Sequence, residues 1–464
     1  MAELRLGELA ARMKGSLLRG NPDLRFDTFG IDSRSTRPGE LFFALSGARD
    51  GHAFVADAAS RGAAGAVVSR TEDLGRSTEG LALIQVADTT AALQTLAAGL
   101  VKDYNPRVVA ITGSVGKTTT KEFTAALLGR KFRVLKSEGN FNNHLGLALS
   151  LLKLEKAHQV AVVEMAMSAA GEIRRLTRIA PPDIAVITNV NPVHLAFFED
   201  LAAIARTKKE ILDGAKKSAK AVLNADDTLV MGLAEGFRGD RITFGLSERC
   251  LVRAERIEFL GWEGIRFVLK YGSRRTEVRL PFLTEGYLWD FLAACGAVFG
   301  MNLSLEEIVA RSAELGPFSR RGSVHRLSRG LILVDDSYNS NPRALEAALH
   351  GLGRIPAKRK VAVLGDMLEL GPQEVEFHDR AGREAVASGW GRLVTVGPLS
   401  RTTGQAALRA GLETRYLDSY ADSREASRAV PGLLEPGDLV LVKGSHGMRM
   451  DLIADSILEA FKES

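Results

Sequence analysis

The apolar residues of the chain form two patterns: short β-branched runs, and longer segments with apolar positions at helical spacing. In the middle of the chain these patterns alternate, and we predict strands over 108–112, 160–164, 184–188 and 221–224 with helices between them. This alternation is typical of a parallel sheet covered by helices. The carboxyl ends of such strands face one crevice, so the polar residues that follow the four strands are expected to meet there.

A phosphate-binding pattern follows the first of these strands. It reads Thr112-Gly113-Ser114-Val115-Gly116-Lys117-Thr118-Thr119-Thr120, and a helix is predicted over 121–128. The two glycines let backbone N–H groups approach an anion, the lysine would reach the outer phosphates of a nucleotide, and the Thr118 hydroxyl would bind Mg²⁺. The usual loop has its first glycine where this chain has Ile111, so the pattern is a shortened form. The alternative is an ordinary glycine-rich connection between a strand and a helix.

Other polar residues follow the remaining strands. Glu164 ends an apolar strand, where a charge is costly without a partner, so it is either a Mg²⁺ ligand or half of a buried ion pair. His194 lies at the same sheet edge and is either a ligand or a structural histidine. The amides of 140–143 either bind substrate or cap the helix that follows. Lys208 and Lys209 lie on a predicted helix, and on their own they indicate a solvated charged face.

The two ends of the chain complete the fold prediction. The first hundred residues combine short strands, glycine turns and alanine-rich helices, and Asn105-Pro106 ends the last of these helices. After Gly316-Pro317 a second set of strands and helices begins, without a GxGxxG pattern at its first turn. We therefore predict an α/β protein of three domains: a mixed α/β domain over 1–106, a central parallel-sheet ATPase domain over 107–314, and a Rossmann-like doubly wound domain over 315–464.

Composition and charge narrow the functional classes. A length of 464 residues suggests about three domains at roughly 150 residues each. The net charge of +5 suits phosphorylated or carboxylate-bearing substrates. The chain has no Lys/Arg run interleaved with aromatic residues, so the sequence does not indicate nucleic-acid binding. Cys250 and Cys295 show no CxxC spacing and fit a reducing compartment. No apolar run is long enough to span a bilayer, so we expect a cytoplasmic protein without membrane insertion.

Several motifs together resemble one family, the Mur ligases, which are the ATP-dependent amide ligases of peptidoglycan precursor synthesis. The phosphate loop, Asn140-Phe141-Asn142-Asn143, Glu164-Met165 and Thr188-Asn189-Val190 through His194-Leu195 match in order and spacing. Five further stretches resemble the branch of the family that adds D-alanyl-D-alanine. These are Asp32-Ser33-Arg34, Asp50-Gly51-His52, Asp335-Asp336-Ser337-Tyr338-Asn339-x-Asn341-Pro342, Leu364-Gly365-Asp366-Met367-Leu368-Glu369-Leu370-Gly371 and Val442-Lys443-Gly444-Ser445.

The resemblance implies a reaction and a set of site residues. ATP would phosphorylate the terminal carboxylate of UDP-N-acetylmuramoyl-tripeptide, and the amine of D-alanyl-D-alanine would attack the acyl phosphate, in a protein that is expected to be a monomer. The implied catalytic residues are Lys117, Glu164, His194 and Lys208, and of these Glu164, His194 and Lys208 join Thr118 in binding two Mg²⁺ ions. The implied ATP-binding residues are Gly113, Ser114, Val115, Gly116, Lys117, Thr118, Thr119, Asn189, Arg321 and Asp336. The implied substrate-binding residues are Ser33, Arg34, Asp50, His52, Asn142, Asn143, Asn339, Asn341, Lys443 and Ser445.

Two features of the resemblance concern single residues. Family members carry a carbamylated lysine as a Mg²⁺ ligand, and Lys208 fits that position, with Lys209 one residue away. The family's His-Asn-x-x-Asn segment, which helps to hold the nucleotide, corresponds here to 286–294, and we expect Leu288 and Phe291 in place of the two asparagines. Stacking on Tyr287 or Trp289 would then replace the amide contacts to adenine.

The role of three polar residues in the N-terminal part of the chain is open. Ser33, Arg34 and His52 form either a polar binding edge or a solvated loop. Two rival functions are also open. One is a sibling ligase that adds a different amino acid, which the Asp-Asp-Ser-Tyr-Asn stretch opposes. The other is a nucleotide-binding protein that has lost the chemistry, which the full set of implied catalytic residues opposes.

Overall fold

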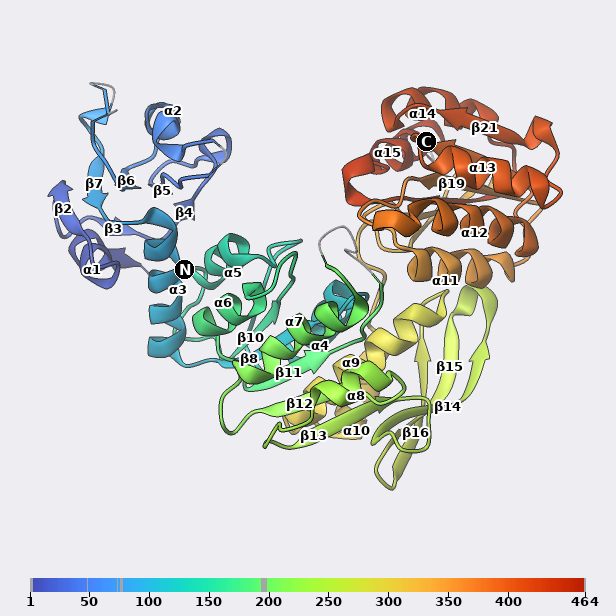
Figure 1. Ribbon diagram of the computed structural model, residues 1–464, viewed down its shortest axis with the longest axis horizontal. Coiled ribbons are helices and arrows are strands. Elements are labelled where there is room, and N and C mark those ends of the chain that lie inside the picture. The colour runs from blue at the N-terminus through green and yellow to red at the C-terminus, as the bar shows by residue number, and fades with distance from the viewer. Residues whose placement is uncertain (1–2, 48, 73, 76–77, 193–197, 463–464) are drawn as a thin grey trace.

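The structure is a computed structural model that describes residues 3–47, 49–72, 74–75, 78–192 and 198–462. It contains three α/β bodies that follow one another along the chain (Figure 1). Each main sheet lies inside one of the three predicted domains, while the domain boundaries themselves remain predictions. No helix in the described ranges is both long enough and apolar enough to cross a membrane.

The first body is built on a five-stranded sheet with the order β2-β7-β6-β5-β4. Strands β4 to β7 are parallel, and β2 joins antiparallel to β7. The elements are β1 (Leu4–Arg5), α1 (Leu6–Arg12), β2 (Ser16–Arg19), β3 (Arg25–Phe26), β4 (Phe29–Gly30), β5 (Leu41–Phe43), α2 (Val55–Ser60), β6 (Gly65–Val68), β7 (Ala82–Gln85) and α3 (Thr89–Tyr104). Helix α3 begins at Asp88, whose carboxylate accepts two backbone N–H groups, and it ends at Asn105 in the left-handed conformation before Pro106.

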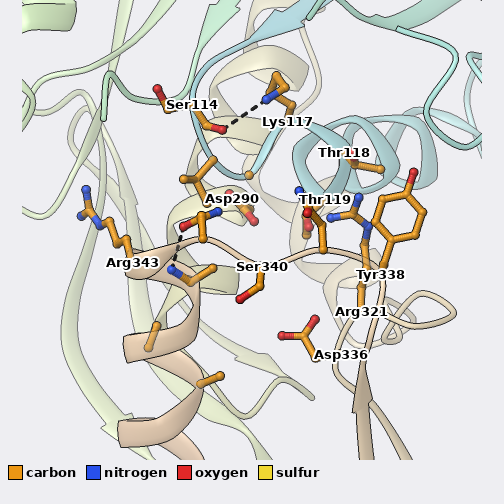
Figure 2. Close-up of a pocket in the computed structure, with 18 of the residues that line it drawn as sticks. Ser114, Lys117, Thr118, Thr119, Asp290, Arg321, Asp336, Tyr338, Ser340 and Arg343 are labelled. Carbon is orange, nitrogen blue, oxygen red and sulfur yellow. Dashed lines mark hydrogen bonds between the residues drawn. The ribbon is translucent and has the colours of Figure 1, made fainter. Parts of the chain in front are cut away.

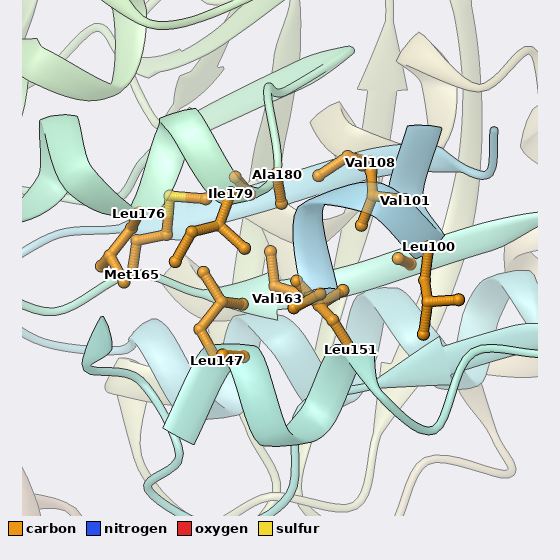
Figure 3. Close-up of a cluster of buried hydrophobic side chains, with 14 of the residues drawn as sticks. Leu100, Val101, Val108, Leu147, Leu151, Val163, Met165, Leu176, Ile179 and Ala180 are labelled. Atoms are coloured by element: carbon orange, nitrogen blue, oxygen red, sulfur yellow. The ribbon is translucent and has the colours of Figure 1, made fainter. Parts of the chain in front are cut away.

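Helix α3 also joins the first body to the second. Its apolar side chains pack against helices α5 (His144–Leu151) and α6 (Glu172–Ile179), which cover one face of the central sheet. Figure 3 shows Leu100 and Val101 of α3 in one buried cluster with Leu147 of α5 and Ile179 of α6. The N-terminal domain therefore shares a continuous apolar core with the central domain.

The central body has a nine-stranded sheet with the order β16-β15-β14-β13-β12-β11-β8-β10-β9. Its strands are β8 (Arg107–Thr112), β9 (Val134–Lys136), β10 (Val160–Glu164), β11 (Ile184–Ile187), β12 (Lys220–Asn224), β13 (Arg241–Gly245), β14 (Val252–Phe259), β15 (Ile265–Tyr271) and β16 (Arg274–Leu280). Helices α5, α6, α7 (Leu201–Asp213) and α8 (Thr228–Leu233) cover one face, and α4 (Lys117–Leu128), α9 (Glu285–Gly300) and α10 (Leu305–Ser312) cover the other.

Two details of this sheet bear on the prediction. The four strands predicted from the apolar runs are present within one residue of the expected bounds. The sheet is mixed rather than purely parallel, because β14, β15 and β16 form an antiparallel meander at its edge. In the parallel part, Glu164 on β10 pairs in register with Ile111 on β8, so both strands end at the same level beside the phosphate loop.

The third body is doubly wound, as predicted. Its six-stranded sheet has the order β17-β18-β22-β19-β20-β21 and is parallel apart from β17. Two apolar clusters pack on its opposite faces, one with α11 and α12 and one with α14 and α15. The elements are β17 (Ser323–Arg326), β18 (Ile332–Asp336), α11 (Pro342–Gly353), β19 (Arg359–Gly365), α12 (Glu374–Ala387), β20 (Arg392–Val396), α13 (Ser400–Arg409), β21 (Leu417–Tyr420), α14 (Ser423–Ala429), β22 (Asp438–Lys443) and α15 (Asp451–Ala460).

Candidate active site

A cavity of about 700 Å³ lies between the central and C-terminal bodies. Its central wall consists of the phosphate loop, the loop before α5, the end of β10 and the first turn of α9. Its other wall consists of the ends of β18 and β22 and the first half of α11. Polar strand ends from two different sheets therefore face each other across one space (Figure 2).

The phosphate loop adopts a shape that only glycine allows at two positions. Gly113 has φ +150° and Gly116 has φ +85°. A Cβ atom at Gly113 would lie 1.9 Å from the Thr188 hydroxyl, and one at Gly116 would lie 1.9 Å from Oδ1 of Asp290. The backbone N–H groups at the start of α4 are left facing the cavity, which is the arrangement that binds phosphate.

The segment after β11 holds this loop in place. The Asn189 side chain accepts from the Val115 N–H at 2.9 Å and donates to the Val115 carbonyl at 3.0 Å. The Thr188 hydroxyl donates to the same carbonyl at 2.7 Å, and Ser114 Oγ accepts from the Asn191 N–H at 2.9 Å. Asn189, expected to bind ATP, therefore braces the loop through both halves of its amide and also lines the cavity.

Lys117 lies over the loop, with Nζ donating to the carbonyls of Gly113 at 2.9 Å and Ser114 at 3.2 Å (Figure 2). Burial lowers the pKa of Lys117, and the positive charge of Arg321 adds to this, whereas the nearby carboxylates of Glu164 and Asp290 oppose it. A bound phosphate would place a further anionic group beside this amine.

Glu164 fits a divalent cation. It is 2 % exposed, Oε2 accepts from the Thr118 hydroxyl at 2.7 Å, and Oε1 accepts from the Asn142 amide at 2.9 Å. Within the described part of the chain, no cation forms an ion pair with this carboxylate. A buried carboxylate and a hydroxyl side by side are hard oxygen ligands of the kind that Mg²⁺ takes together with nucleotide phosphates. No cluster of three or more His, Cys, Asp or Glu side chains that could hold a metal alone is found among the described residues.

The two neighbouring lysines on α7 differ sharply. Lys208 is 2 % exposed, and burial, with the charge of Lys117 nearby, lowers its pKa well below the ordinary value. Lys209 points outward and its Nζ donates to Asp213 at 3.2 Å. The prediction of a solvated charged face is wrong for Lys208 and correct for Lys209. His194 lies outside the described residues.

At the start of α9, the residues that face the cavity are not the two that the sequence indicated. Leu288 and Phe291 are fully buried in the central core, so neither reaches the cavity. The cavity face instead carries Tyr287 and Asp290, which have the same three-residue spacing one position earlier. A helix cannot present both pairs to the same side, and the apolar pair faces the sheet because its burial is favourable.

Asp290 is an unusual carboxylate. Its side chain lies against Gly116 and hydrogen-bonds the Thr119 side chain. Burial raises the pKa of this carboxyl to about 8, and the positive charge of Arg321 is the main influence that opposes the rise. The hydroxyl of Tyr287 donates to the Arg321 carbonyl at 2.5 Å, and its ring stacks on Phe282 at a centroid distance of 4.6 Å. Trp289 lines the cavity as well.

The C-terminal side of the cavity brings together all six residues expected there, which are Arg321, Asp336, Asn339, Asn341, Lys443 and Ser445. Lys443 is buried and donates to Asp336 at 2.5 Å and to the Asn339 carbonyl at 3.0 Å. The Arg321 guanidinium stacks over the Tyr338 ring at 4.2 Å. Asn341 and Ser445 also have structural contacts, because Asn341 caps α11 and Ser445 Oγ accepts from the Leu368 N–H at 2.8 Å.

The predicted residues of the N-terminal body lie elsewhere, since no described residue before 114 lines the cavity. His52 is 2 % exposed; its ring contacts Asp50 at 2.6 Å and accepts from the Ser69 N–H at 2.9 Å, so it is a buried organising residue rather than part of a solvated loop. Ser33 is buried, whereas Arg34 is exposed and lowers the pKa of Asp32 to about 2. Asn143 caps α5 and lies outside the cavity lining.

Sequence reasoning missed several cavity residues. Asp290, Ser340 and Arg343 line the cavity but were not expected there. Asp290 had a usable signal, because a charged residue three positions from a tyrosine at a helix start marks a polar face. Ser340 and Arg343 lie beside predicted residues, and only the fold shows that they face the same space.

Comparison with known proteins decides the family. The Mur ligase middle domain matches residues 111–298, and the Mur ligase glutamate ligase domain matches residues 320–446. The chain belongs to the Mur ligase family. The two matched ranges include the phosphate loop, Glu164 and most of the residues that line the cavity on both bodies.

This Mur ligase is similar over nearly its whole length to proteins named UDP-N-acetylmuramoyl-tripeptide–D-alanyl-D-alanine ligase. The Bacillus subtilis UDP-N-acetylmuramoyl-tripeptide–D-alanyl-D-alanine ligase is 33% identical, covering 97% of this chain and 98% of its own, and the Escherichia coli enzyme of the same name is 31% identical over 99% of both. A MurF crystal structure from Acinetobacter baumannii aligns with a TM-score of 0.89 at 30% identity over 99% of both chains. A Thermotoga maritima MurF ligase in complex with ADP aligns with a TM-score of 0.79 at 28% identity, covering 93% of this chain and 97% of its own. The three-domain α/β architecture predicted from the sequence is confirmed.

Proposed function

We propose that this Mur ligase joins D-alanyl-D-alanine to UDP-N-acetylmuramoyl-tripeptide with ATP, giving the pentapeptide, ADP and phosphate. The observation that carries the proposal is one cavity in which the phosphate loop and the Thr118–Glu164 pair face the strand ends of a second domain. The full-length likeness to ligases of that name supports the choice of substrates. The sibling ligases and the lapsed binding protein have no comparable support.

The proposed reaction has two steps, phosphoryl transfer to the tripeptide carboxylate and then amide formation. A terminal carboxylate oxygen of the tripeptide attacks the γ-phosphorus of ATP, and the bond from that phosphorus to the bridging oxygen breaks to release ADP. The neutral amine of the dipeptide then attacks the acyl carbon, the new C–N bond forms, the C–O bond to phosphate breaks, and the amine loses its proton. Phosphate is a far better leaving group than a carboxylate oxygen, so positioning and charge neutralisation are the work left to the protein.

We assign the first step to the residues on the central wall. The N–H groups of 113–118 would cradle the nucleotide phosphates, and Lys117 would leave the loop carbonyls to contact the transferred phosphoryl group. Mg²⁺, when bound, would neutralise phosphate charge, and Thr118, Glu164, His194 and Lys208 are the residues we propose to hold it. The Asn142 amide keeps the Glu164 carboxylate oriented toward Thr118.

We further propose that Lys208 carries a carbamate. Burial lowers the pKa of the Lys208 amine, and a neutral amine is the form that adds CO₂. Lys209 is the matched control, because it lies on the same helix with its amine exposed. Nuclear magnetic resonance of the protein equilibrated with ¹³C-bicarbonate should show a carbamate signal in wild type and Lys209→Ala that is absent in Lys208→Ala. A signal that survives in Lys208→Ala would contradict this assignment.

For adenine we propose a contact with Trp289, because one face of the Tyr287 ring is already covered by Phe282. A nucleotide-bound structure in which both rings lie far from the base would contradict this. A monomeric state and a cytoplasmic location remain predictions.

The test of the function is phosphate release from ATP and Mg²⁺, measured with each substrate alone and with both. Wild type should require both substrates, and Lys117→Ala should lose at least a hundredfold in rate, because the transferred group loses its cation. Lys209→Ala should match wild type. Release with a free amino acid but not with the dipeptide would indicate a sibling ligase, and nucleotide binding without turnover would indicate a lapsed enzyme.

A further inference from the structure

A hydrogen bond from Arg343 crosses between the two domains that form the cavity. Arg343 lies on the first turn of α11, lines the cavity and is exposed (Figure 2). Its Nη1 donates to Oδ1 of Asn191 in the central domain at 3.2 Å. Asn191 follows β11 and belongs to the segment that braces the phosphate loop. The C-terminal domain therefore contacts the support of the phosphate loop.

From Asn191 a chain of hydrogen bonds continues to the phosphate loop itself. The Asn191 Nδ2 donates to Oδ1 of Asn189 at 2.8 Å, and that oxygen also accepts from the Val115 N–H at 2.9 Å. The main chain of Asn191 is bound as well, because its N–H donates to Ser114 Oγ at 2.9 Å and its carbonyl accepts from the same hydroxyl at 3.0 Å. Two consecutive residues of the loop are thus tied to the segment that Arg343 contacts.

Arg343 fixes the orientation of the amides in this chain. A guanidinium can only donate, so the oxygen of the Asn191 amide must face Arg343 and its NH₂ group must face Asn189. The Asn189 oxygen then accepts, and the Asn189 NH₂ group donates to the Val115 carbonyl at 3.0 Å. Without the cation the Asn191 amide can also turn its oxygen toward the Asn189 oxygen, and two acceptors that meet cannot bond. Loss of Arg343 should therefore loosen the brace on the loop.

The braced loop carries the amine that we assign to phosphoryl transfer. Lys117 Nζ rests on the carbonyls of Gly113 and Ser114, so a shift of the loop moves this amine too. A misplacement of about 1 Å can cost roughly a hundredfold in rate. Binding of the nucleotide depends on several N–H groups at once, so we expect it to be less sensitive to such a shift than the chemical step.

We propose that Arg343 is a positioning residue for phosphoryl transfer and acts through Asn191 and Asn189 on the phosphate loop. The inference rests on the proposed function and adds that the first chemical step depends on the C-terminal domain. When the two domains lie as they do here, the Arg343–Asn191 bond is formed and the loop is braced. Movement of α11 away from the central domain breaks that bond, so ATP is used most rapidly when the domain that completes the cavity is in place.

The test measures the first chemical step apart from nucleotide binding. With all three substrates, Mg²⁺ and enzyme in excess over ATP, rapid quenching gives the rate of ADP formation in a single turnover. Arg343→Met should lower this rate about fivefold or more, with the Kd for ADP unchanged within about twofold and the melting temperature within about 2 °C. Arg343→Lys keeps a donor of similar reach and should recover about half of the wild-type rate or more.

A double variant separates a positioning role from direct contact with a substrate. Asn191→Ala breaks the chain one step further in, so it should slow ADP formation by a similar factor, and Arg343→Met should then add nothing. The matched control is Arg354→Met at the other end of α11. Arg354 also reaches the central domain, but its guanidinium lies over the Phe259 ring at 5.4 Å rather than at the segment that braces the loop. Its variant should keep the wild-type rate within about twofold.

Two results would overturn the inference: equal rates for wild type and Arg343→Met, or a slowing by Arg343→Met that is just as large in the Asn191→Ala background. Failure of wild type to form ADP with all three substrates would instead overturn the proposed function. Hydrogen exchange gives an answer without turnover, because the Val115 amide donates to Asn189 and should exchange about threefold faster in Arg343→Met than in wild type or Arg354→Met. Unchanged exchange would contradict the inference even if Asn191→Ala does not fold.

Discussion

Replacing Asp290 by asparagine should stabilise the ligand-free protein more as the pH rises. The carboxyl of Asp290 is partly buried beside the phosphate loop, and the loss of hydration there raises its pKa from 3.8 to about 8. The folded protein therefore keeps a proton there that the unfolded chain has already released. Asparagine has nearly the same shape and can also form hydrogen bonds, but its side chain does not titrate.

The magnitude follows from linkage. Because the folded-state pKa is raised, the stabilising effect of the bound proton is complete below pH 3.8 and is lost progressively as the pH rises through 8. Each pH unit well below the folded-state pKa is worth about 1.4 kcal/mol, and the slope falls as the group titrates, so between pH 6 and pH 8 the wild type should lose roughly 2.3 kcal/mol that Asp290→Asn keeps. For a domain of about 200 residues this corresponds to roughly 5 to 10 °C in melting temperature.

The assay is the melting temperature of wild type and Asp290→Asn in low-salt buffers from pH 6 to 9.5 without nucleotide. The difference between the two proteins should grow up to pH 8 and then stay level. Asp226→Asn is a suitable comparison, because the pKa of Asp226 is lowered by its hydrogen bonds to Ser247 and the neighbouring backbone. Parallel curves for wild type and Asp290→Asn across the whole range would refute the reasoning.

Three further predictions concern packing around the site. Lys121→Met should destabilise the central domain by about 2 to 4 kcal/mol in urea unfolding and lower kcat, because its buried ammonium donates to two carbonyls of the loop that also carries a predicted substrate amide. Gly116→Ala should abolish phosphate release, because its Cβ would collide with Asp290 and φ there is +85°; adding Asp290→Ala should restore part of it. Trp262→Ala removes the stacking of Arg326 across the two domains and should cost about 0.5 to 1 kcal/mol in interdomain contact, seen as a larger radius of gyration in X-ray scattering.

The fold was predictable because its strands are short and apolar and end at polar residues. The runs at 160–164 and 108–112 became β10 and β8 almost without change, and the breakers at Pro106 and at Gly316-Pro317 fall between sheets. The α10 helix (Leu305–Ser312) was not predicted, although Ser304 and Glu307 form a capping box that marks its start.

Single-residue roles were less predictable, because they depend on which face of a helix meets the sheet. Lys208 and Lys209 differ by one position, and only the packing of α7 shows which amine is buried. Leu288 and Phe291 likewise match a motif in spacing, but their apolar side chains turn them into the core. The sequence left two registers open for the lysines and indicated only one for the start of α9, and in both cases burial in the folded protein decides which residue faces the cavity.

The two walls of the cavity belong to different sheets, and this arrangement limits what any one domain can do. Lys117, Thr118 and Glu164 lie on the central domain, whereas Ser340 and Arg343 lie on the C-terminal domain. The acyl phosphate and the amine that attacks it must approach to bonding distance, so the spacing of the two domains controls the second chemical step. A change at the interdomain contact should therefore slow amide formation more than it weakens nucleotide binding, whereas a change in the phosphate loop should affect both.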